Sequence, residues 1–148
     1  NYIKNKDSKK KYNKQYNIKN KDDIRRYKQD YRVSANGAWA SFASRRQRPN
    51  LSITKEEFIE WYKTTPDSCA YCGSQLGEVE QFLSKIKVRI KRVSFDIDRK
   101  DNNKGYEIDN IVKSCVVCNF HKADFFSYED FKKISLKFIK KKIQKSDY

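Results

Sequence analysis

Two motifs decide the fold of this chain: Cys69-Ala70-Tyr71-Cys72 and Cys115-Val116-Val117-Cys118. They contain all four cysteines, and a spacing of two residues lets a tight turn direct both thiolates towards one point. The alternative is two disulfides, but the chain shows no secretory leader, so we expect an intracellular, reducing compartment in which this spacing favours metal. We therefore predict one structural zinc ion (Zn²⁺) bound by Cys69, Cys72, Cys115 and Cys118.

The composition indicates a small core and a negatively charged partner. Of the 148 residues, 37% are apolar and 36% are charged, and 34 Lys and Arg against 19 Asp and Glu give a net charge of +15. Such an excess destabilises a compact chain by self-repulsion, and a polyanionic partner is the usual reason for it. We expect a domain that binds nucleic acid, DNA first and RNA as the alternative. No apolar run approaches the roughly 20 residues that span a bilayer, so no membrane is expected.

The pattern of residue types divides the chain into four segments. A start rich in Lys and Asn predicts a basic, flexible arm, and a helical pattern follows it. The cysteine motifs enclose a mixed core, and a second helical pattern ends the chain. The predicted segments are an arm at 1–20, helices over 21–64, a zinc-binding core at 65–127 and a basic helix at 128–148.

The two helical segments carry their own start and stop signals. In the first, Gly37 is the expected break, and Thr54 with Glu57 forms a capping box. Residues 81–90 fit either a helix or a basic strand. In the last segment, Ser127 caps a helix whose apolar residues are expected to face inward: Phe131, Ile134, Phe138, Ile139 and Ile143. Three arginines at a predicted helix end suit bidentate phosphate contact: Arg45, Arg46 and Arg48.

Within the predicted core, two extended segments precede the second cysteine motif and a helix follows it. Alternation over residues 93–98 predicts a half-buried strand, with Asp96 and Asp98 together on its open face. A turn at 101–105 leads to a second strand or extended segment at 106–112. This order is a compact ββα unit. The predicted fold class is α+β, a zinc-stapled ββα core with flanking N- and C-terminal helices.

The ββα unit places one carboxylate near one amide. Asp98 ends the first predicted strand and Asn119 lies near the start of the helix, so folding the hairpin against the helix brings the two side chains together. A sparse set of oxygen ligands suits Mg²⁺, which keeps several waters and takes one or two ligands from the protein. Such an ion, or Mn²⁺ in its place, polarises a phosphodiester and stabilises the leaving oxygen.

These stretches resemble the HNH endonucleases, also called ββα-metal or His-Me finger nucleases. Within that family the chain is most similar to the PacI-like restriction endonuclease branch, over roughly residues 50–130. The resemblance rests on Thr54-x-x-x-Phe58-x-x-Trp61-Tyr62, Cys69-x-Tyr71-Cys72-Gly73, Phe95-Asp96-Ile97-Asp98-Arg99, Gly105-Tyr106, Asp109-Asn110-Ile111 and Cys115-x-x-Cys118-Asn119-x-x-Lys122.

The resemblance implies roles for individual side chains. Asp98 and Asn119 would hold the catalytic metal, and Tyr71 would act as base or nucleophile. Arg99 stands where the usual base histidine of the family stands and would stabilise charge at the phosphate, while Asn110 would brace the loop. The zinc bound by the four cysteines would do no chemistry. The expected nucleic-acid contacts are Arg45, Arg46, Arg48, Lys104, His121 and Lys122.

The resulting prediction is a divalent-metal-dependent HNH endonuclease that hydrolyses phosphodiester bonds in double-stranded DNA, of restriction, homing or mobile-element type. Cutting both strands usually needs two active sites, which suggests a homodimer. The alternative is a non-catalytic zinc module that keeps the ββα fold and binds DNA or RNA, for example within a ribonucleoprotein. Asp98 and Asn119 favour the enzyme, and the missing base histidine favours the alternative.

Overall fold

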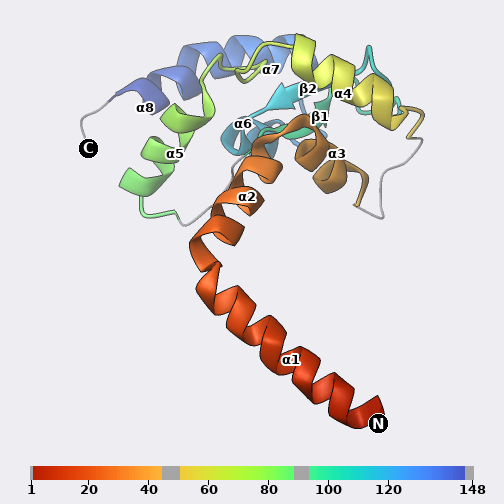
Figure 1. The fold of residues 1–148 in the computed structure, drawn as a ribbon. Coiled ribbons are helices and arrows are strands. Elements are labelled where there is room, and N and C mark those ends of the chain that lie inside the picture. Colours follow the sequence, from red (N-terminus) through yellow and green to blue (C-terminus); the bar gives the residue numbers. More distant parts are fainter. Residues whose placement is uncertain (1, 45–50, 89–93, 146–148) are drawn as a thin grey trace.

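The computed structural model describes residues 2–44, 51–88 and 94–145, which form helices around one short hairpin (Figure 1). In chain order the elements are α1 (Tyr2–Lys19), α2 (Lys21–Val33), α3 (Ala35–Ala43), α4 (Lys55–Thr64), α5 (Leu76–Lys85), β1 (Asp96–Arg99), β2 (Ile111–Ser114), α6 (Val116–Lys122), α7 (Tyr128–Ile134), the π-helical turn η1 (Ser135–Ile139) and α8 (Lys140–Gln144). None of the helices in these ranges has the length and apolar character needed to cross a membrane.

The basic arm is helical. Helix α1 projects away from the rest of the molecule (Figure 1), and its side chains from Lys6 to Lys19 are all exposed. Lysine has a favourable helix propensity, but the segment lacks an apolar stripe that could pack on the core. The predicted basic arm is thus a helix, and its exposure follows from the composition.

The break between α2 and α3 falls at Ser34, and the predicted break at Gly37 is wrong. Ser34 has an extended backbone and caps α3, because its Oγ accepts a hydrogen bond from the Gly37 N–H at 3.2 Å. A serine in this position satisfies one of the free N–H groups of the first turn, so it can begin a new helix. Gly37 lies inside that turn and is buried.

Helices α4 and α7 begin at the predicted caps. Thr54 Oγ1 accepts from the Glu57 N–H at 3.3 Å, and Glu57 Oε2 accepts from the Thr54 N–H at 2.8 Å, which completes the capping box. Ser127 Oγ accepts from the Asp130 N–H at 3.2 Å. The open question at residues 81–90 is answered in part, because Gln81 to Lys85 lie in α5; residues 89–93 are outside the described ranges.

The antiparallel hairpin separates two parts of the core. Asp98 lies opposite Val112, and Ile97 lies opposite Lys113. Opposed residues share a face and successive residues alternate between faces. The Asp98 face carries α6, and the Ile97 face packs on α3 and α4. Strand β2 begins only at Ile111, near the end of the extended segment predicted at 106–112. The residues just before Ile111 form a turn instead.

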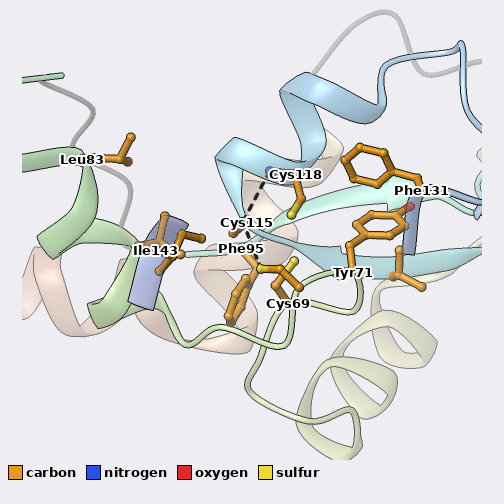
Figure 2. Packing of buried hydrophobic residues seen from close by; sticks show 11 residues of the cluster. Cys69, Tyr71, Leu83, Phe95, Cys115, Cys118, Phe131 and Ile143 are labelled. Carbon is orange, nitrogen blue, oxygen red and sulfur yellow. Dashed lines mark hydrogen bonds between the residues drawn. The ribbon is translucent and has the colours of Figure 1, made fainter. Parts of the chain in front are cut away.

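Two buried clusters occupy these two sides. The cysteine cluster unites the hairpin with α5, α7 and α8, and Figure 2 shows its members around the sulfur atoms. The aromatic cluster joins α3, α4 and the other hairpin face, with the Phe42 and Phe58 rings stacked at 5.0 Å. Its aromatic members are Trp39, Phe42, Phe58, Trp61, Tyr62 and Tyr106. Large buried rings compensate for the low apolar content of the chain.

The C-terminal helix contains a wider π-helical turn at Ser135–Ile139. The extra residue in that turn rotates the following side chains around the axis relative to an α-helix. Ser135, which opens the turn, is buried, whereas Phe138 is 57% exposed, so the prediction that Phe138 faces the core is wrong. Phe131 and Ile143, on either side of the turn, are buried as predicted.

Candidate active site and metal centre

The four cysteines meet in the core at distances that suit one metal ion. They are buried free thiols, and their Sγ atoms all lie within 4.8 Å of one another. Cys72 Sγ and Cys115 Sγ are 3.9 Å apart. A tetrahedral site with Zn–S bonds of about 2.3 Å requires sulfur atoms about 3.8 Å apart. The donor set therefore fits a zinc ion between the two motifs.

Local backbone geometry directs the sulfurs inward. In the first motif the Gly73 N–H donates to the Cys69 carbonyl at 2.8 Å, and Gly73 has φ +72, a left-handed conformation that glycine adopts without strain. In the second motif Cys115 caps α6, and its Sγ accepts from the Cys118 N–H at 3.4 Å. Figure 2 shows Cys69, Cys115 and Cys118 converging from the loop and the helix.

Asp98 lies at the centre of a cluster formed by the first cysteine motif, β1 and α6. Tyr71 Oη donates to Asp98 Oδ2 at 2.7 Å, and Lys122 Nζ lies 3.5 Å from the same oxygen. The Arg99 N–H donates to Asp98 Oδ1 at 2.9 Å. The carboxylate is only 16% exposed. It is thus held in one orientation by donors from the first cysteine motif, from β1 and from α6.

Tyr71 is fully buried. Its ring packs against Phe131 at 5.2 Å and against Tyr128 at 5.4 Å. Burial and the neighbouring Asp98 carboxylate raise the pKa of Tyr71 far above its ordinary value. The phenol therefore keeps its proton and donates a hydrogen bond to Asp98, and it offers no exposed surface to a substrate in this conformation.

Asn119 lies on the same face of the unit but bonds a different carboxylate. Its Nδ2 donates to Asp96 Oδ2 at 3.3 Å. Asp96 is only 8% exposed, so the prediction that it lies on an open face is wrong, because α6 covers that face. Within the described ranges, the side-chain contacts of Asp98 are with Tyr71 and Lys122, and Asn119 is joined to Asp96. The bond to Asp96 orients the Asn119 amide.

Lys122, one of the predicted phosphate contacts, is buried in this structure. Its exposed fraction is 0%, and besides Asp98 its Nζ contacts Asn102 Oδ1 at 3.1 Å. The site therefore contains a buried ammonium that balances the Asp98 charge. One sequence signal indicates that Lys122 lies at the site: it follows Asn119 by three residues and therefore shares its helical face.

Arg99 is held at the edge of the loop that joins the two strands. Its Nη1 donates to the Lys104 carbonyl at 3.0 Å, its Nη2 lies 3.8 Å from Asp124 Oδ1, and its Cζ lies 5.3 Å from the centre of the Tyr106 ring. The side chain is 17% exposed. Because it follows Asp98 on the strand, its side chain starts from the opposite face of the hairpin.

Asn110 is buried and crosslinks the same loop. Its Nδ2 donates to the Gly105 carbonyl at 2.8 Å and to the Asp101 carbonyl at 3.1 Å, and its Oδ1 accepts from the Asp101 N–H at 2.9 Å. All polar atoms of the amide are used within the loop. This geometry supports the bracing role that the resemblance implies.

The remaining predicted contacts are peripheral. His121 is exposed, with its Nδ1 2.7 Å from the Val117 carbonyl, and Lys104 is exposed on the loop. The three arginines lie outside the described residues: Arg45, Arg46 and Arg48.

No family model and no curated protein matches this chain. A solved structure does: that of the rare-cutting HNH restriction endonuclease PacI, which exhibits a mechanism of DNA perturbation. The two share 23% sequence identity with a TM-score of 0.55, over 72% of this chain and 77% of that chain. This chain has an HNH-type fold. The predicted fold class, α+β with four cysteines placed to bind a metal, is confirmed.

Proposed function

We propose that this protein is a divalent-metal-dependent HNH endonuclease that hydrolyses phosphodiester bonds in double-stranded DNA. The observation that carries the proposal is the Asp98 carboxylate, held by the Tyr71 hydroxyl at 2.7 Å on the α6 face of the hairpin. The HNH-type fold and the net charge of +15 support it. The exposed lysines of α1 offer further positive charge to a DNA backbone.

The catalytic ion would be a hydrated Mg²⁺ or Mn²⁺, which takes only one or two ligands from the protein. Asp98 and Asn119 would hold it, one by a carboxylate and one by an amide oxygen. When bound there, the ion would polarise the scissile phosphate and stabilise the leaving oxygen.

The surrounding side chains orient these ligands. Tyr71 fixes the Asp98 carboxylate, and Asp96 fixes the Asn119 amide. Lys122 limits the cost of burying Asp98 before a cation arrives, because it supplies a positive charge. Arg99 lies at the edge of the adjoining loop, where its guanidinium would contact a phosphate of the bound DNA.

A second candidate is the non-catalytic zinc module that binds DNA or RNA. The Lys122–Asp98 ion pair is the specific observation that favours it, because an ammonium already neutralises the carboxylate that would hold the catalytic metal. In such a module the pair would serve stability alone.

Incubation of supercoiled plasmid with the full chain separates the two functions. We expect nicked or linear product with Mg²⁺ or Mn²⁺ and none when the ion is omitted. Omission is preferable to chelation, since a chelator would also attack the cysteine site. Fluorescence anisotropy with a labelled duplex measures binding in parallel. Binding without nicking in either metal supports the non-catalytic module, and failure to bind DNA contradicts the endonuclease and the DNA-binding form of the module.

Tyr71→Phe tests whether the tyrosine reacts or positions. The change keeps the ring contacts and removes only the hydroxyl on Asp98. We expect roughly a 10–100-fold loss of cleavage rate, which is the range typical of an outer hydrogen bond to a metal ligand, with partial recovery at higher Mg²⁺. Single-turnover cleavage over a Mg²⁺ titration measures both.

The matched control is Tyr62→Phe, because Tyr62 is also buried and its ring contacts Lys113 on the other hairpin face. It should cleave at the parent rate. Complete loss in Tyr71→Phe at every metal concentration would instead identify the Tyr71 hydroxyl as the nucleophile or base.

A further inference from the structure

The turn that follows α6 exposes an aromatic side chain from a strained backbone. Ala123 has φ 46 and ψ −145, a region that residues with a side chain rarely adopt. Two residues later, Phe125 is 85% exposed, the largest exposed fraction among the large apolar side chains of the described residues. A single exposed apolar residue is common in proteins. One that is held on a strained turn indicates a functional role, because backbone strain is concentrated at functional sites.

Both ends of this turn are tied to the candidate active site. Lys122, just before it, contacts Asp98, and the Ala123 carbonyl accepts from Asn102 Nδ2 at 3.4 Å. Asp124 Oδ1 lies 3.8 Å from Arg99 Nη2. Phe125 is therefore held near the Asp98 cluster by contacts on either side of the strained residue.

The Phe125 ring also packs against other aromatic side chains. Phe125 meets Phe126 edge to face, with ring centres 4.9 Å apart. Phe126 in turn packs on Phe131 at 5.7 Å, and Phe131 is 1% exposed in the cysteine cluster. The exposed Phe125 ring is thus connected to the core through Phe126 and Phe131.

We propose that Phe125 is a wedge that inserts between the base pairs of duplex DNA beside the scissile phosphate, an inference that rests on the proposed function. Apolar side chains that enter a base step unstack it partially and kink the duplex. Attraction between the basic protein and the phosphates offsets the loss of base stacking, and contact of the ring with a base replaces part of it. A rigid ring next to the site would also present a strained phosphodiester for attack.

Plasmid relaxation tests the wedge without knowledge of a target sequence. The full chain is bound to closed circular DNA, with divalent ion omitted, while a metal-independent topoisomerase relaxes it. An inserted side chain unwinds the duplex and leaves residual supercoils after the protein is removed. We expect unwinding with the parent, its loss with Phe125→Ala, and its retention with Phe125→Leu, which keeps an apolar wedge.

Phe120→Ala is the matched control. Phe120 is 79% exposed on α6, but it lines a groove with Phe82 and Phe138 between α5 and η1. This variant should unwind DNA like the parent. Anisotropy should show a roughly 5–150-fold weaker affinity for Phe125→Ala, with an unchanged salt dependence because no charge is altered.

The outcomes separate the wedge from the nuclease. Unwinding by Phe125→Ala equal to that of the parent overturns the wedge, and so does a parent that binds DNA without unwinding it; in both cases metal-dependent cleavage can still be observed. A parent that does not bind DNA overturns the wedge and the proposed function together.

Discussion

Replacing Asp98 with asparagine is expected to lower the cleavage rate by roughly 10³-fold or more. A divalent ion contributes several kcal/mol to the transition state, and about 1.36 kcal/mol corresponds to a tenfold change in rate. Asparagine preserves the size of the side chain and an acceptor for Tyr71, but it removes the negative charge. Plasmid nicking and titration with Mn²⁺ measure the loss of rate and of metal binding.

The stability of this variant needs its own control, because Lys122 would remain buried without a carboxylate. Removing one partner of a buried pair costs about 3–5 kcal/mol, whereas replacing both is often neutral. The double variant Asp98→Asn/Lys122→Met should therefore regain thermal stability but stay inactive. The control is Asp109→Asn, at an exposed residue on the loop that joins β1 and β2, and this variant should be as active as the parent. Cleavage within tenfold of the parent by both Asp98 variants would place the reaction elsewhere.

Removing the metal from the four cysteines is expected to unfold the part of the core that they hold together. Structural zinc contributes about 10–16 kcal/mol in zinc-finger peptides, as much as the net stability of a typical domain, about 5–15 kcal/mol. Cys115→Ser removes one ligand and should bind zinc weakly or not at all. We expect loss of the cooperative thermal transition and rapid hydrogen exchange in β2 and α6. Metal analysis and exchange mass spectrometry measure these effects.

Val79→Ala is the control for a simple packing defect. Val79 belongs to the same buried cluster and is 3% exposed, so its truncation costs about 1–3 kcal/mol but leaves every sulfur in place. This variant should keep one zinc per chain. A purified parent that contains no metal yet melts cooperatively, or a Cys115→Ser variant as stable as Val79→Ala, would refute a structural zinc site.

Short-range signals in the sequence predicted the local structure well. The cysteine spacing, the capping box at Thr54 and the cap at Ser127 each depend on residues within three or four positions, and the structure confirms them. The ββα order followed from the same kind of signal. The break near Gly37 was misplaced because two local signals competed, and the Ser34 cap outweighed the flexibility of glycine.

The differences from prediction at the candidate site concern contacts between distant segments. Asp96 and Lys122 are buried because α6 docks on the hairpin, and a pattern of polar residues does not reveal which face another element will cover. The exposure of Phe138 depends on a π-helical turn, for which residues 135–139 carry no recognisable signal. The hydrogen bond between Tyr71 and Asp98 joins residues 27 positions apart, and no pattern in the sequence predicts it.

The separation of the two buried clusters by the hairpin has a practical consequence for spectroscopy. Both tryptophans of the chain, Trp39 and Trp61, pack in the aromatic cluster, and all four cysteines belong to the other. Intrinsic tryptophan emission therefore observes only one half of this molecule. A preparation could lose its metal and the order around α6 while its fluorescence spectrum still looked native.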